Sequence, residues 1–129
     1  MMDFDKALYY YQKCRDIREK TLPPNHPYLA NLYLNIGVTY NHMDDYDKSR
    51  SYYEKCRAIR EKILPVNHPD LGSLYMNMAV LCIAQRQYPD AQAYNQKALD
   101  IFAKILPPNH PNLQKTQQLH ELISQHINP

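Results

Sequence analysis

Apolar residues recur every three or four positions along much of the chain, which is the spacing of one buried face of an α-helix. Between positions 29 and 40 the apolar set with this spacing is Leu29, Leu32, Tyr33, Ile36, Val38 and Tyr40. A second stretch with this spacing runs from Tyr46 to Ile63, and the short polar segment NHMDDYDK lies at the junction of the two. Connections this short join antiparallel helices that lie side by side, so the pattern predicts helical hairpins.

One segment of the sequence occurs three times. The residues IREKTLPPNHP at 17–27 return as IREKILPVNHP at 59–69 and as IFAKILPPNHP at 101–111, so each copy begins 42 residues after the last. Chance does not produce such agreement. A period between about 20 and 50 residues indicates a repeat architecture.

The repeated segment contains signals that end one helix and begin another. Pro23 and Pro24 cannot continue a helix, so the helix before them must end near residue 21. Pro27 suits the first helical position, and His26 before it is held in the extended conformation of an N-cap residue. The three copies therefore divide the chain into helices, which we place at 3–21, 28–43, 46–64, 70–86, 88–106 and 112–127.

The residues of each unit resemble the tetratricopeptide repeat, which has an aromatic residue, Leu-Gly and Tyr in its first helix and Ala and Phe in its second. In the first complete unit these places are held by Tyr33, Gly37, Tyr40, Ser49 and Tyr53. A 42-residue unit with a long second helix and an NHP corner is similar to the arrays of kinesin light chains and their relatives. The departures from the pattern are Ala79, Cys82 and Asn95 in the second unit, and Gln117, His120, Glu121 and Ser124 in the last helix.

This resemblance implies an all-α fold, a right-handed superhelical solenoid of antiparallel helix pairs. It covers residues 1–129 as a single tetratricopeptide array. The array would comprise a half repeat at 3–21, repeats at 28–64 and 70–106, and a terminal helix at 112–127.

The resemblance also implies a function, the binding of an extended peptide in a concave groove lined by the first helix of each pair. The residues that would face this groove are Asn31, Leu34, Asn35, Val38, Asn41 and His42 in one repeat, and Ser73, Met76, Asn77, Val80, Ile83 and Ala84 in the next. Asn35 and Asn77 are equivalent by the 42-residue shift, and an amide can both donate to and accept from a peptide backbone. The alternative is that these asparagines lie on a solvated face and bind nothing.

The first predicted helix aligns with the second helix of a pair. Because repeats bury surface only against their neighbours, Phe4, Leu8 and Tyr11 are expected to need cover, whereas the polar last helix suits a cap. We therefore expect either a fragment of a longer array or a protomer that self-associates through the N-terminal helix. A further alternative is that the array regulates a domain linked to it.

The composition adds limits to this picture. Hydrophobic residues make up 44% and charged residues 22%, as in a globular protein. The chain lacks an apolar run of membrane-spanning length and a secretory signal at its start, so we expect no membrane association and a cytoplasmic location. A net charge of +2 does not favour nucleic acid. The long helices each end with a lysine at an equivalent position, Lys20, Lys62 and Lys104. A positive charge in the last turn interacts favourably with the helix dipole; the alternative is that these lysines form a basic rim that attracts acidic peptides.

No residue pattern indicates catalysis or a metal site. The recurring histidines lie on separate corners, too far apart to share one ion. Cys14 and Cys56 occupy a core position and Cys82 replaces a core tyrosine, so all three are expected to be buried and inert. Carboxylates such as Asp16 and Glu19 alternate with arginines at helical spacing, which is typical of a solvated face. We expect no cofactor and no enzymatic activity, and a protein or peptide as the partner.

Overall fold

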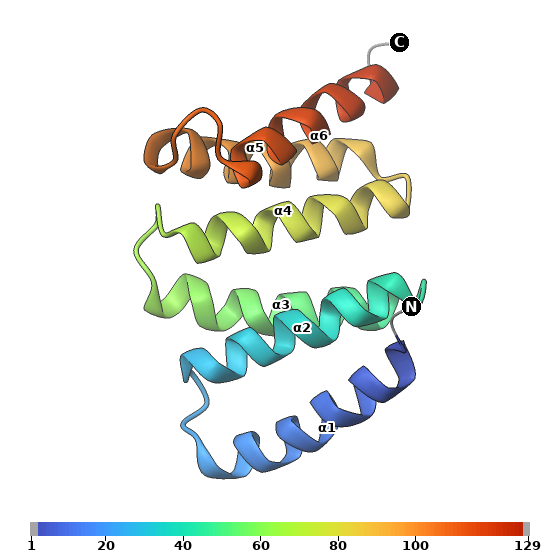
Figure 1. The fold of residues 1–129 in the computed structure, drawn as a ribbon, viewed down its shortest axis with the longest axis vertical. Helices are drawn as coiled ribbons and strands as arrows, with labels where there is room; N and C mark the ends of the chain where they lie inside the picture. The colour runs from blue at the N-terminus through green and yellow to red at the C-terminus, as the bar shows by residue number, and fades with distance from the viewer. Residues whose placement is uncertain (1–2, 128–129) are drawn as a thin grey trace. The chain divides into compact units, whose positions relative to one another are not determined.

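The computed structural model describes residues 3–127, and all regular secondary structure in this range is α-helical (Figure 1). The helices are α1 (Phe4–Thr21), α2 (Pro27–His42), α3 (Tyr46–Ile63), α4 (Pro69–Ala84), α5 (Tyr88–Ile105) and α6 (Pro111–Ile127). They form two compact units, Met1–Leu64 with α1 to α3 and Pro65–Pro129 with α4 to α6. The predicted all-α fold is confirmed.

The helix boundaries differ from the predicted ones by one or two residues. Each NHP proline is the first residue of its helix, as predicted for Pro27, because a first-turn position needs no N–H donor; the ranges placed from 28 and 70 begin one residue late. The second helices end one residue early. Leu64 and Leu106 each precede a proline and have extended backbones, with ψ of 148° in both, because the proline ring excludes the helical conformation.

The three histidines of the repeated corner cap the helices that follow them. The Nδ1 atom of His26 accepts from the N–H of Tyr28 at 3.1 Å, and His68 and His110 accept in the same way at 3.0 and 3.1 Å. His26 and His68 also have the extended backbone of an N-cap residue. The prediction of histidine caps is confirmed, and the reason for the motif is local: it satisfies a free N–H at each helix start.

Replacing these histidines with alanine should lower the free energy of unfolding by about 1 kcal/mol per corner, because each N–H loses its side-chain acceptor. Asparagine at the same positions is the matched control, since its carbonyl oxygen can accept the same bond. Urea unfolding followed by circular dichroism measures both series. Equal losses in the alanine and asparagine series would mean that the histidine rings act through packing and not through capping.

The turns inside the two hairpins are alike. Asp44 and Arg86 occupy equivalent places and have left-handed backbones, with φ of 61° and 59°. The next N–H in each turn, from Asp45 or Gln87, donates back to a carbonyl of the preceding helix, at 2.9 and 2.8 Å. These bonds satisfy carbonyls that the end of the helix leaves free, so both hairpins reverse direction over the same few residues.

The core of the first unit depends on one glycine. The Tyr53 side chain on α3 is 1% exposed, and its ring lies directly against Gly37 of α2, where an added Cβ would be only 2.6 Å from two ring carbons. The hydroxyl of Ser49 donates to the Gly37 carbonyl at 2.7 Å. The glycine therefore allows the two helices to approach with a tyrosine between them.

Helix α1 packs on α2, which partly covers the residues predicted to need cover. Leu8 and Tyr11 pack against a cluster that contains Leu32 and Ile36, and the Phe4 ring stacks on His42 of α2. The prediction was thus wrong about which residues remain open. The exposed apolar side chains of α1 are Tyr9, Tyr10 and Ile17, and α1 has no fully buried residue.

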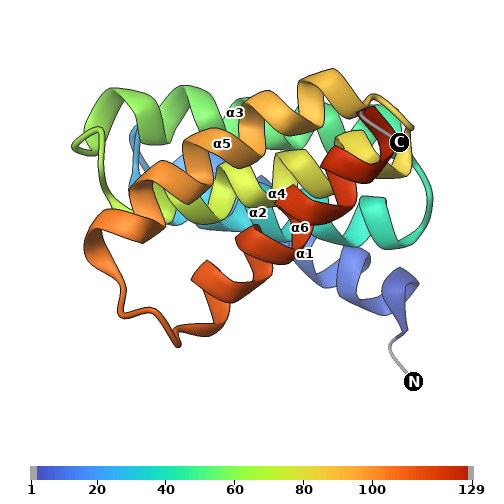
Figure 2. The same cartoon turned by 90° about the horizontal axis from the view of Figure 1, so that it is seen from above.

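The second unit has a different glycine contact. Phe102 of α5 is fully buried, and its ring lies against Gly72 of α4. Helix α6 packs on α5 and touches α4, and the corner that joins α5 to α6 is seen from above in Figure 2. At the α5–α6 contact the Asn95 amide donates to the Thr116 carbonyl at 2.9 Å, while its Oδ1 atom has no partner among the described residues.

Candidate functional site

The predicted groove residues of the first unit lie along one face of α2. Asn31, Asn35 and His42 are exposed, and Leu34, Val38 and Asn41 are half-buried. This mixture of amides and partly open apolar side chains can form hydrogen bonds beside small apolar contacts.

Two of these residues already have partners within the first unit. The Asn31 Oδ1 atom accepts from the guanidinium of Arg60 on α3 at 2.8 Å. The His42 ring stacks on Phe4, with ring centres 5.4 Å apart. Within residues 3–127 the Asn35 side chain makes no hydrogen bond, so its amide is available to a ligand.

The corresponding face of α4 is less open. Ser73, Asn77 and Val80 are half-buried. Met76 is only 7% exposed, and Ile83 packs against the core cluster of the second unit. Asn77 also makes no side-chain hydrogen bond among the described residues, but it is half-buried whereas Asn35 is exposed.

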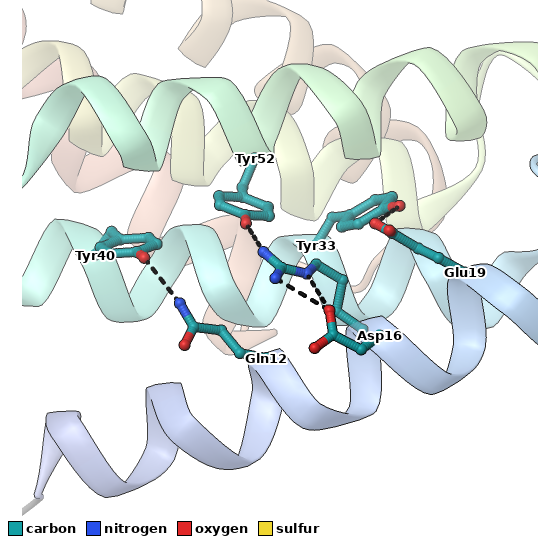
Figure 3. Close-up of polar contacts among 7 residues, drawn as sticks. Gln12, Asp16, Glu19, Tyr33, Tyr40 and Tyr52 are labelled. Atoms are coloured by element: carbon teal, nitrogen blue, oxygen red, sulfur yellow. Dashed lines mark hydrogen bonds and ion pairs between the residues drawn. The ribbon is translucent and has the colours of Figure 1, made fainter.

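A polar network between α1 and the α2–α3 hairpin was not predicted (Figure 3). The Arg15 guanidinium donates to the Tyr52 hydroxyl and to the Asp16 carboxylate. The Tyr33 hydroxyl donates to Glu19 at 2.8 Å, and Gln12 donates to the Tyr40 hydroxyl at 3.3 Å; Figure 3 shows these bonds side by side along α1.

The interpretation of the α1 charges as a solvated face holds for Asp16 and Glu19, which are exposed, but not for Arg15. The Arg15 side chain is 27% exposed, and Glu19 bonds to a buried tyrosine. Burial, together with the hydrogen bond to Glu19, raises the pKa of Tyr33 to about 12. The spacing of charges gave no sign of this, because tyrosine hydroxyls on another helix supply the partners.

Lysines of the second helices lie over tyrosines of the first. The Nζ atom of Lys55 is 5.5 Å from the centre of the Tyr33 ring and 5.1 Å from that of Tyr52. In the second unit Lys97 lies 5.3 Å from the Tyr75 ring, the equivalent contact. A cation over an aromatic face is attracted by the ring quadrupole, so within each hairpin this contact helps to hold the second helix against the first.

The side chains with potential reactivity are mostly enclosed. Cys56 and Cys82 are buried as predicted, whereas Cys14 is partly exposed because it lies on α1. Across residues 3–127, no three His, Cys, Asp or Glu side chains are close enough to share a metal ion. None of the described helices combines the length and the apolarity that a membrane-crossing helix needs.

Two units built from antiparallel helices, joined by the same proline–histidine corner, define an α-helical repeat protein. The family model named Tetratricopeptide repeat matches residues 1–62 and 28–104, and the chain belongs to this family. Its members generally serve as protein–protein interaction scaffolds and are typically non-enzymatic. Among curated proteins no match is found.

Solved structures with the same fold include the following two. BtubC (BKLC) from P. vanneervenii is 17% identical to this chain, with a TM-score of 0.89. A putative kinesin light chain from Podosopora anserina, with nearly identical TPR-like repeats, is 22% identical, with a TM-score of 0.75. Each match covers 96% of this chain, but only 50% and 59% of those chains. This chain therefore spans little more than half of their length. The predicted array of the kinesin-light-chain type is confirmed.

Proposed function

We propose that this chain binds an extended peptide along α2 and α4, with Asn35 and Asn77 bonded to the peptide backbone. The supporting observation is that these two amides occupy equivalent repeat positions and have no side-chain partner among the described residues. Leu34 and Val38 beside Asn35, and Val80 beside Asn77, are half-buried and offer small apolar contacts. The amides would supply affinity independent of sequence, and the apolar neighbours would supply preference.

The test is a double substitution, Asn35→Ala with Asn77→Ala. Peptides selected from a random library on the native chain are expected to bind the double variant at least about tenfold more weakly, because two backbone hydrogen bonds are lost. The matched control replaces two exposed amides of the second-type helix α5, Gln92→Ala with Gln96→Ala. Helicity measured by circular dichroism should be the same in both variants.

Equal affinity in the native chain and the double variant would exclude the amide clamp. An equal loss in the α5 control would place the peptide on a different surface.

A second function is that the chain is a unit of a longer array, or a protomer that self-associates, with α1 as the contact. The observation that favours it is the absence of any buried residue on α1, whereas α3 buries Ser49, Tyr53, Cys56 and Ile59 at the matching positions. Such an array would regulate a domain linked to it. Sedimentation at micromolar concentration separates the unit of a longer array from the self-associating protomer. If the chain sediments as a monomer, self-association through α1 is excluded.

A further inference from the structure

The packing of α2 on α3 shows what one stripe of a second helix contacts. Along α3 this stripe contains Lys48, Tyr52 and Lys55. The Tyr52 ring contacts both Tyr33 and Tyr40 of α2, with ring centres 6.0 and 5.8 Å apart. Lys48 lies over Tyr40, and Lys55 over Tyr33. The stripe therefore accepts two tyrosines that are seven residues apart on the facing helix.

Helix α1 carries the same stripe at the equivalent positions. Lys6, Tyr10 and Lys13 correspond to Lys48, Tyr52 and Lys55 by the 42-residue shift. On α1, however, the stripe is exposed: Tyr10 is 63% exposed, the Lys6 side chain is 88% exposed, and the Lys13 Nζ atom lies 4.5 Å from the ring centre of Tyr9, an exposed residue of the same helix.

The next position in the stripe gives the clearest contrast. Ile17 is 63% exposed, whereas the equivalent Ile59 and Ile101 are each 5% exposed. Similarly, Tyr11 is only partly buried, whereas its equivalent Tyr53 is 1% exposed against Gly37. This face of α1 thus carries the same residue types as the face of α3 that packs against α2, but they are exposed.

A second copy of this chain does not offer a suitable free helix. In α2 and α4 the tyrosines already contact lysines of their own hairpins. In α6 the places of Tyr33, Gly37 and Tyr40 are taken by Gln117, Glu121 and Ser124. Two α1 stripes facing each other would bring lysines together, which is unfavourable. These contacts favour a partner helix from elsewhere over self-association.

We propose that the Lys6–Tyr10–Lys13–Ile17 stripe of α1 binds an amphipathic helix of the α2 kind. Such a helix has aromatic residues seven positions apart and a small residue between them. The aromatic rings would lie under Lys6 and Lys13, and the small residue would cover Tyr11 as Gly37 covers Tyr53. This deepens the second function above and is independent of the peptide surface that contains Asn35 and Asn77.

The probe is a fluorescent synthetic peptide with the sequence of residues 23–45, and its binding to the full chain is measured by anisotropy. Binding is expected, and Ile17→Glu on the chain should weaken it at least tenfold. Val66→Glu is the matched control, because Val66 is an 80% exposed corner residue that is not part of the α1 stripe. Ile17 is itself exposed, so its substitution should leave the circular dichroism spectrum unchanged.

The peptide variant Tyr33→Gln, Gly37→Glu, Tyr40→Ser, which has the chemistry of α6, should not bind. No binding of the native peptide, or binding that Ile17→Glu leaves unchanged, would overturn the proposal; the latter would mean that the peptide replaces α2 on α3. The Asn35→Ala, Asn77→Ala variant should bind the α2 peptide normally, so failure of either proposal can be recognised separately.

Discussion

Replacing Phe102 with alanine is expected to lower the free energy of unfolding by about 3–5 kcal/mol. The ring is fully buried, and its edge lies against Gly72, so the substitution leaves a cavity beside a residue that has no side chain to fill it. Because the helices of the hairpin also approach over this glycine, little relaxation can close the space. Urea unfolding of the full chain, followed by circular dichroism, measures the loss.

The control for this substitution is Ile105→Ala on the same helix, since Ile105 is 41% exposed. Its loss should be about 1 kcal/mol or less, because an exposed side chain buries little apolar surface. A loss under 1 kcal/mol for Phe102→Ala would mean that the ring does not hold α4 and α5 together.

Gly37→Ala is expected to lower the free energy of unfolding by about 2 kcal/mol, although glycine to alanine in a helix ordinarily stabilises by about 1 kcal/mol. The new Cβ would lie 2.6 Å from ring carbons of Tyr53 and 3.3 Å from the Ser49 carbonyl oxygen. The ring is 1% exposed and cannot move aside, so the cost of overpacking exceeds the gain in helix propensity.

The second unit supplies the control for Gly37→Ala. There, Ala79 and Asn95 occupy the places of Gly37 and Tyr53. In a Tyr53→Asn background the same Gly37→Ala change should therefore raise the free energy of unfolding, by up to about 1 kcal/mol. If Gly37→Ala destabilises both backgrounds equally, the Tyr53 ring is not the cause.

The two glycines show how repeats with one backbone plan can exchange side chains. In the first unit the glycine faces Tyr53, while Ala30 and Arg60 occupy the places that Gly72 and Phe102 hold in the second. In each unit the first helix of the hairpin has a glycine at the position that faces the large aromatic ring of the second helix. The sequence shows both substitutions, but only the packed helices show that each glycine is paired with its ring.

The candidate site divides in the same way. Helical spacing predicts that Asn31, Asn35 and Asn41 share one face of α2. It could not show that Asn31 is bonded to Arg60, since that bond joins residues 29 positions apart. Nor could it show that Met76 is nearly enclosed. The spacing of residues fixes a helix face, whereas the partners of that face depend on the neighbouring helices.

The sequence alone determined where the helices begin and end, because proline and the histidine cap act on the backbone within a few residues of themselves. It also determined the 42-residue repeat and therefore the family. Only the tertiary structure decided that Glu19 and Arg15 bond to tyrosines and that Tyr10 and Ile17 remain open. These outcomes depend on which helices meet, and a contact between distant residues leaves no signal in the local order of amino acids.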